Sequence, residues 1–459
     1  MPTQSAPTFV DSASGPGRRL GFSRVIPIAM VAIGVMVLMS SPGLAAQTDQ
    51  PAPAGEAREK STSEEAEAVA QEGTADTKDS ATSAGEEKTD KKPVKAYYKK
   101  GLHITTGDGT FAATINWRAQ LRLTDLSSSD LVGEEDGVEE EAGFLIRRAR
   151  FKLKGHAYRT WLKYYLEYGI AGNILLTWQF DVQPLDQIGM RVGQWKVLYN
   201  RERVDSSGKQ QFVDRSIVNN PFTVDRQQGL SAQGHLFEGT RGDSRYALGV
   251  YTGTGRGGDL DGDRRPMYVG RWQWNFLKRD LAFSQSDTKP HEKAAASFAL
   301  AAASNVSAYT RFSSSGGGQL AGFSDGVTGQ YKLQQWVAEY AHQFKGFSFQ
   351  GEYHEKRVDD RVNNQITDLR GFYAQVGYFF HEAFPSFPRP LEFALRVAQV
   401  DSDGAVDFPA DREATLGMNW FFSGHSNKLT ADFSRLESSG EFGTEDNGWR
   451  ARLQWDITF

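Results

Sequence analysis

Trp449-Arg450-Ala451-Arg452-Leu453-Gln454-Trp455-Asp456-Ile457-Thr458-Phe459 ends the chain, and apolar residues alternate with polar ones at every position. Successive side chains of a β-strand point to opposite faces, so this stretch predicts a strand with one apolar and one polar face. An arginine that faced lipid near the bilayer midplane would cost about 2 to 4 kcal/mol, whereas a water-filled interior accepts it. The pattern fits the wall of a transmembrane β-barrel, and also a half-buried strand of a soluble sandwich, which has the same period.

The beginning of the chain favours the membrane interpretation, because it predicts export. Arg18, Arg19 and Arg24 precede an apolar run over residues 25–39, and Ala45 and Ala46 offer small residues for cleavage. The run of about 15 residues is shorter than the roughly 20 of a spanning helix, so we expect a cleaved signal peptide over residues 1–46 rather than an uncleaved anchor. The paired arginines also permit a twin-arginine signal, but that route exports folded proteins, and a barrel must cross the inner membrane unfolded.

Residues 47–96 form a segment of low complexity. It carries 12 acidic and 7 basic residues, and it contains no aromatic residue and no Ile, Leu or Met. Such a composition cannot bury a core and predicts disorder. We interpret the segment as a spacer between the signal peptide and the folded domain; a periplasmic tether or partner-binding arm is the alternative.

From residue 97 onward, short alternating segments are separated by Gly, Asn, Asp and Pro, which predicts an all-β domain over residues 97–459. Consecutive hairpins without intervening helices favour an antiparallel up-and-down barrel. About 363 residues, at roughly 20 to 23 for each strand and its connection, predict about 16 strands, with 14 or 18 as alternatives. Besides the closing stretch, we expect strands at residues 115–123, 144–154, 161–170, 174–180, 188–195, 246–252, 266–276, 305–312, 331–340, 347–354, 371–380, 391–400, 414–422 and 428–436.

Composition argues against catalysis. The chain has no cysteine, which excludes disulfides, thiolate nucleophiles and cysteine metal sites. No zinc-protease motif pairs two histidines and no nucleophile elbow is present, so we expect no enzyme, no cofactor and no metal site. Residues 259–263 resemble part of a calcium-binding loop, but the twelfth position is Gly270 instead of glutamate, and we expect an exposed turn.

On several predicted strands, basic residues alternate in sequence so that they fall on the polar face. A stretch rich in acids at residues 134–141 precedes a strand in which four cations fall on one face. The total charge of −5 leaves about −2 for residues 97–459, so any anion selectivity must come from the placement of cations. Because side chains alternate between the two faces of a strand, the basic residues on the polar faces are candidates for the barrel interior. They are Arg118, Arg122, Arg148, Arg150, Lys152, Lys154, Arg191, Arg271, Arg311, Arg396, Arg450 and Arg452.

The connection at residues 197–228 is too long for a plain hairpin turn. If the chain begins in the periplasm, this connection is the third external loop, and it carries Arg201, Arg203, Arg215 and several acids. A loop of this kind either folds into the lumen and narrows it or lies on the surface, and periodicity alone does not decide between the two.

Three blocks at residues 144–151, 193–203 and 212–216, together with a late strand at 413–422 and the terminal Phe459, resemble the phosphate-selective porin O and P family. The resemblance covers residues 97–459. It implies a 16-stranded homotrimeric porin of the Gram-negative outer membrane that passes small anions, phosphate or related oxyanions among them, along arginines to a lysine-containing constriction. The residues that we expect to contact the anion are Arg118, Arg122, Arg147, Arg148, Arg150, Lys152, Lys196, Arg201, Arg203 and Arg215.

The preferred interpretation is therefore a passive diffusion channel for small anions, with outer-membrane lipid and lipopolysaccharide as its surroundings and no nucleic-acid partner. A non-selective general porin and a barrel that only anchors a surface or adhesion protein are the alternatives within the membrane. A soluble, secreted β-rich protein is a third possibility, which the aromatic terminal strand opposes.

Overall fold

A computed structural model describes residues 93–126, 142–260, 262, 264–312, 317–404, 411–439 and 445–459. The predicted signal peptide, most of the predicted disordered segment and the acidic stretch at 134–141 lie outside these residues. So do Asp261 and Asp263 of the predicted exposed turn.

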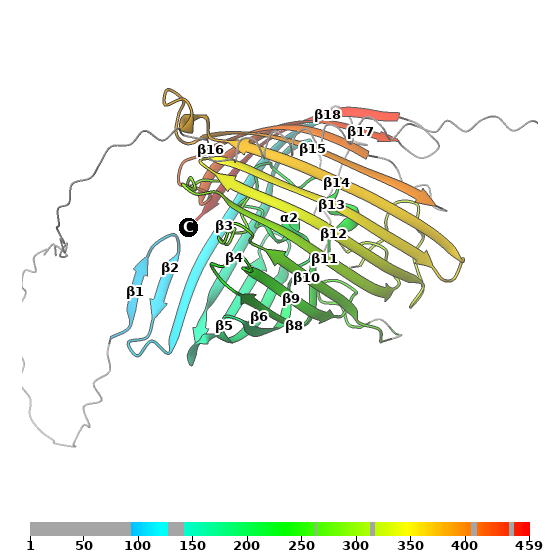
Figure 1. Ribbon diagram of the computed structural model, residues 1–459, viewed down its shortest axis with the longest axis horizontal. Helices are drawn as coiled ribbons and strands as arrows, with labels where there is room; N and C mark the ends of the chain where they lie inside the picture. The colour runs from blue at the N-terminus through cyan, green and yellow to red at the C-terminus, as the bar shows by residue number, and fades with distance from the viewer. Residues whose placement is uncertain are drawn as a thin grey trace, which may run out of the picture. The chain divides into compact units, whose positions relative to one another are not determined.

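Within these residues, sixteen antiparallel strands form a closed barrel, as the sequence predicts. Each strand from β3 to β18 pairs with the next, and β18 pairs with β3 in the register Leu453↔Leu123 to close the wall (Figure 1). The strands are β3 (Phe111–Leu126), β4 (Gly143–Ala157), β5 (Arg159–Gly169), β6 (Ile174–Leu185), β7 (Ile188–Lys196), β8 (Arg226–Leu236), β9 (Ser244–Tyr251), β10 (Met267–Trp274), β11 (Ala295–Ser307), β12 (Tyr331–Phe344), β13 (Phe347–Asp360), β14 (Gln365–Tyr378), β15 (Leu391–Gly404), β16 (Asp411–Phe421), β17 (Asn427–Ser439) and β18 (Glu445–Thr458).

A short hairpin precedes the barrel. It consists of β1 (Lys95–Tyr98) and β2 (Leu102–Thr105), and β2 pairs with the first residues of β3. Helical structure in the described residues is limited to α2 (Arg201–Val204), α3 (Asn219–Phe222) and the 3₁₀ turn η2 (Phe380–Glu382). None of these helices is long and apolar enough to span a bilayer.

Two predictions of strand position are wrong. Strand β8 was not expected, because its sequence Arg226-Gln-Gln-Gly-Leu-Ser-Ala-Gln-Gly-His-Leu236 contains too few apolar residues to show a period of two. Strand β11 lies at Ala295–Ser307 instead of residues 305–312, because its inward face is mostly alanine and serine and gives little polar contrast to the outward Phe298, Leu300 and Val306. Pairing with neighbouring strands stabilises both segments.

The two faces of the wall have opposite character. On β18, Trp449, Leu453 and Trp455 point outward and are 38–42% exposed, whereas Arg450 and Arg452 point inward and are buried. On this strand the apolar face therefore meets the surroundings and the polar face meets the lumen, which is the arrangement of a transmembrane barrel.

The barrel has two mouths with different connections. The chain enters at β3 and ends after β18 at the same mouth, which we call the terminal mouth. The opposite mouth, which we call the loop mouth, carries the connections that follow β3, β5, β7, β9, β11, β13, β15 and β17.

Candidate functional site

The connection between β7 and β8, residues 197–225, folds into the lumen. Most of its side chains are less than 9% exposed, including the charged Arg201, Glu202 and Arg203. Its contacts reach the opposite wall, because Asn200 donates to Glu352 of β13 at 3.0 Å. The alternative of an exposed surface loop is therefore excluded. We call residues 197–225 the inner loop.

A row of wall carboxylates holds the backbone of the inner loop. Each carboxylate lies on a different strand between β12 and β17 and accepts a backbone N–H of the loop. This satisfies amide groups that the irregular chain cannot pair within itself. The pairs are Arg201 N to Glu339 at 3.0 Å, Glu202 N to Glu352 at 2.6 Å, Ile217 N to Glu413 at 3.0 Å and Val213 N to Asp432 at 2.9 Å.

Wall arginines pair with these carboxylates and with acids of the loop. Arg452 lies 2.8 Å from Asp432 and 3.3 Å from Asp214, and Arg396 contacts Glu413 at 2.5 Å. All of these side chains are 10% exposed or less. A buried carboxylate is tolerated when it is paired and hydrogen-bonded, so these arginines make the loop attachment possible.

Most of the predicted anion-contacting residues on the wall have acidic partners. Arg118 contacts Asp456 at 2.7 Å and Arg122 contacts Asp214. Arg148 donates to Gln120 at 3.1 Å, Arg150 contacts Glu167 at 3.0 Å, and Lys152 lies 3.7 Å from Glu167. Arg147 occupies a bulge of β4, opposite the step from Gln120 to Leu121, and is half-buried.

The predicted cations of the loop region contact the loop itself. Lys196 donates to the carbonyl of Arg203 at 2.9 Å, and Arg203 pairs with Asp225 at 2.6 Å. Arg201 donates to Gln350 at 3.2 Å and lies over the ring of Phe283. Arg215 donates to the carbonyl oxygens of Glu202 and Asp205 at 2.9 and 3.1 Å. These four residues thus hold the inner loop in its folded path.

A second connection enters from the terminal mouth. Residues 275–294 join β10 to β11, and Gln285 donates its backbone N–H to the carbonyl of Lys209 at 3.1 Å and accepts from the N–H of Gln211 at 2.9 Å. The two inward-folded connections therefore meet inside the barrel. Sequence analysis did not predict this contact, because residues 275–294 carry no pattern that distinguishes an inward path from a surface path.

An apolar cluster fills the lumen between the inner loop and strands β9 to β15. Val197, Tyr199 and Phe222 of the loop pack with Val337 of β12 and Leu369 of β14, and all five are fully buried. Water is therefore excluded from this side of the lumen.

On the opposite side of the lumen, along β4 to β7, exposure is confined to the half nearer the terminal mouth, because Arg150, Glu167 and Thr177 farther along these strands are buried. Lys154 and Lys163 are exposed, the side chain of Lys152 is 21% exposed, and the Arg191–Asp181 pair is 19% and 13% exposed. Lys209 of the inner loop is also exposed. The terminal-mouth half of this side therefore presents mostly lysines to water. Lys163 was not among the predicted site residues. The alternation of side chains along β5 places it on the inward face, where it is the register partner of Asp181 on β6.

Burial shifts the ionisation of acids in the inner loop. It raises the pKa of Glu202 to about 8, with the adjacent Glu352 adding to the shift. Burial also raises the pKa of Asp205 to about 6. The docked loop is thus sensitive to pH in the physiological range. No group of three or more acidic or histidine side chains in the described part of the chain is arranged to hold a metal.

A closed antiparallel barrel with an apolar exterior and an inward-folded third loop is the architecture of an outer-membrane porin. The chain belongs to the family described as phosphate-selective porin O and P, whose model matches residues 118–457. This confirms the resemblance seen in the sequence and the location of the barrel in the outer membrane.

Solved structures of outer-membrane proteins are similar to the chain at low identity. OmpT, an outer-membrane protein of Vibrio cholerae, is 7% identical with a TM-score of 0.50, over 76% of this chain and 98% of that one. Its loop L8 deletion mutant is 8% identical with a TM-score of 0.51, over 76% and 100%. An anion-selective porin from Comamonas acidovorans is 12% identical with a TM-score of 0.49, over 76% and 100%. No curated protein matches the chain.

Proposed function

We propose that the protein is a passive diffusion channel that prefers small anions, with phosphate or a related oxyanion as the permeant solute. It is exported by a cleaved signal peptide and assembles as a homotrimer with its terminal mouth in the periplasm. Supporting this proposal, the water-exposed inward side chains along β4 and β5 include Lys154 and Lys163, and Lys152 beside them is partly exposed.

Electrostatics gives these lysines their effect. Two opposite unit charges 4 Å apart attract by about 1 kcal/mol in water, and by more where low-dielectric walls confine the field. An anion that passes several such groups is favoured at each without being trapped at any one, which allows rapid passage. The predicted wall arginines support the proposal indirectly, because Arg118, Arg122 and Arg148 contact Ser207 and Asp214 and so hold the inner loop in the lumen.

A non-selective porin is the second candidate. It is favoured by the pairing of wall arginines with carboxylates, as in Arg118–Asp456 and Arg150–Glu167, because paired charges offset each other toward a passing ion. An anion-preferring channel and a non-selective porin are expected to show different reversal potentials in a salt gradient.

The test is a planar-bilayer recording with the purified barrel in a potassium chloride gradient, followed by addition of phosphate. A reversal potential close to the chloride equilibrium value and a reduced chloride current in phosphate are expected. A reversal potential near zero contradicts anion preference and supports the general porin. Unchanged chloride current in phosphate contradicts the oxyanion.

A further inference from the structure

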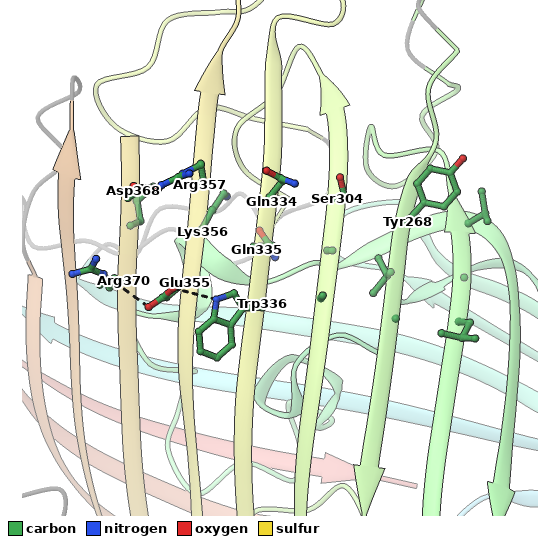
Figure 2. A pocket seen from close by; sticks show the side chains of 18 of the residues that line it. Tyr268, Ser304, Gln334, Gln335, Trp336, Glu355, Lys356, Arg357, Asp368 and Arg370 are labelled. Atoms are coloured by element: carbon green, nitrogen blue, oxygen red, sulfur yellow. Dashed lines mark hydrogen bonds and ion pairs between the residues drawn. The ribbon is translucent and has the colours of Figure 1, made fainter. Parts of the chain in front are cut away.

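The outer face of the wall carries a hollow of about 990 Å³ across strands β8 to β14. Figure 2 shows it from close by, with most of its labelled polar side chains on β12 to β14 and with Tyr268 and Ser304 on β10 and β11. Small residues form its floor, among them Gly270 of β10 and Ala302 of β11. The hollow lies on the opposite side of the wall from the lumen, so a solute in the pore does not reach it.

The two ends of the hollow differ in chemistry. Toward β8 and β9 it is lined by Leu230, Leu248 and Val250. Toward β13 and β14 it is lined by Glu355, Arg357, Asp368 and Arg370. A ligand that fills the hollow must therefore be apolar over most of its length and polar at one end.

The polar end lies at the height of a membrane surface. Glu355 is eight residues from the beginning of β13 at Phe347, which places it about 20 Å along the barrel axis in a belt about 25 Å tall. Trp336 and Tyr353 donate to its carboxylate at 3.1 and 2.8 Å. Trp and Tyr in this orientation, apolar body below and polar tip above, are typical of the membrane interface.

The arginines at this end differ in how strongly they are held. Arg357 makes two parallel contacts with Asp368 at 2.8 and 2.9 Å. Arg370 lies 4.0 Å from Glu355, and its side chain is 54% exposed. Guanidinium groups match the oxygens of phosphate with paired donors, so Arg370 in particular is placed to accept an anionic headgroup.

We infer that the hollow is a binding site for a phosphate-bearing lipid of the leaflet at the loop mouth. Its acyl chains lie over Gly270 and Ala302, and its phosphate contacts Arg370 and Arg357. Apolar burial stabilises the chains, and charge-assisted hydrogen bonds at the interface fix the headgroup. The inference depends on the barrel lying in the outer membrane and is independent of which solute the pore passes.

Lipid retention by the purified barrel tests the site. The barrel is equilibrated in detergent with dioleoyl phosphatidic acid, washed, and assayed for bound phosphate. R357Q/R370Q removes the headgroup contacts, and R412Q/R435Q is the matched control, because Arg412 and Arg435 are exposed outward arginines of β16 and β17 away from the hollow. A302W fills the floor, and A414W adds the same bulk at an exposed outward position of β16.

We expect R357Q/R370Q to weaken retention on the order of tenfold, since two charge-assisted contacts are lost, and A302W to weaken it comparably. Both controls should retain lipid as the wild type does, and all variants should keep their gel shift on boiling. Equal loss in R357Q/R370Q and R412Q/R435Q would show general charge attraction and overturn the site. Undiminished retention in A302W would also overturn it, as would loss of the oligomer in A302W, which would assign the hollow to a second copy of the chain.

Discussion

Reversing the charges of Lys154 and Lys163 tests whether exposed lysines set the selectivity of the pore. Both side chains face the lumen on adjacent strands, and neither has an ion-pair partner within the part of the chain that the structure describes. An anion about 4 Å from one ammonium group gains about 1 kcal/mol in water. A glutamate at the same place imposes a cost of similar size, so each reversal changes the local energy of the anion by about 2 kcal/mol, or roughly 30-fold in occupancy.

The assay is the reversal potential of K154E/K163E in a potassium chloride gradient. We expect the anion preference to disappear or invert at about 0.1 M salt, where the Debye length is about 10 Å, and to change less at about 1 M, where it is about 3 Å. K332E is the matched control, because Lys332 lies on the outward face of β12. If K154E/K163E keeps the wild-type reversal potential at low salt, exposed lysines do not determine selectivity.

Three further predictions concern the inner loop. D432N removes a carboxylate that accepts from Val213 N–H and pairs with Arg452. It should destabilise the docked inner loop by about 3 to 5 kcal/mol and enlarge the single-channel conductance. Unchanged conductance would refute the anchoring role. F222A removes a fully buried ring and should lower the unfolding free energy by about 3 to 5 kcal/mol, measured by denaturant titration, and increase current noise. Because the pKa of Glu202 is raised from 4.5 to about 8, its contribution to docking is greatest below pH 4.5 and is lost as pH rises through 8. Conductance should therefore rise between those values in the wild type and less so in E202Q.

The sequence predicts the wall better than the interior, for a physical reason. Each strand must place apolar side chains toward lipid at every second residue, so a pattern such as that of 449–459 is imposed locally and can be read locally. Where the inward residues are small instead of polar, as in β11, the pattern weakens and the predicted boundary is wrong.

The path of the inner loop depends on contacts between residues far apart in the chain, such as Val213 with Asp432, which no local period encodes. Parity did place Arg452 and Arg396 on the inward face, where the structure has them. The same alternation also places Asp432 and Glu413 on the inward face. Sequence analysis did not consider these acids, and so it missed their ion pairs with Arg452 and Arg396.

The pairing of charges in this lumen bears on the anion preference that we propose for a nearly neutral barrel. Folding a loop of irregular backbone into a barrel requires acceptors for its N–H groups, and carboxylates such as Glu413 and Asp432 supply them. Those carboxylates are buried and need cations such as Arg396 and Arg452, so both signs of charge are used in attaching the loop. What remains for a passing ion is the set of groups that attach nothing and stay in water, and here that set includes Lys154, Lys163 and Lys209. On the proposed function, selectivity is decided by the side chains that the loop leaves uncovered, not by the total charge of the domain.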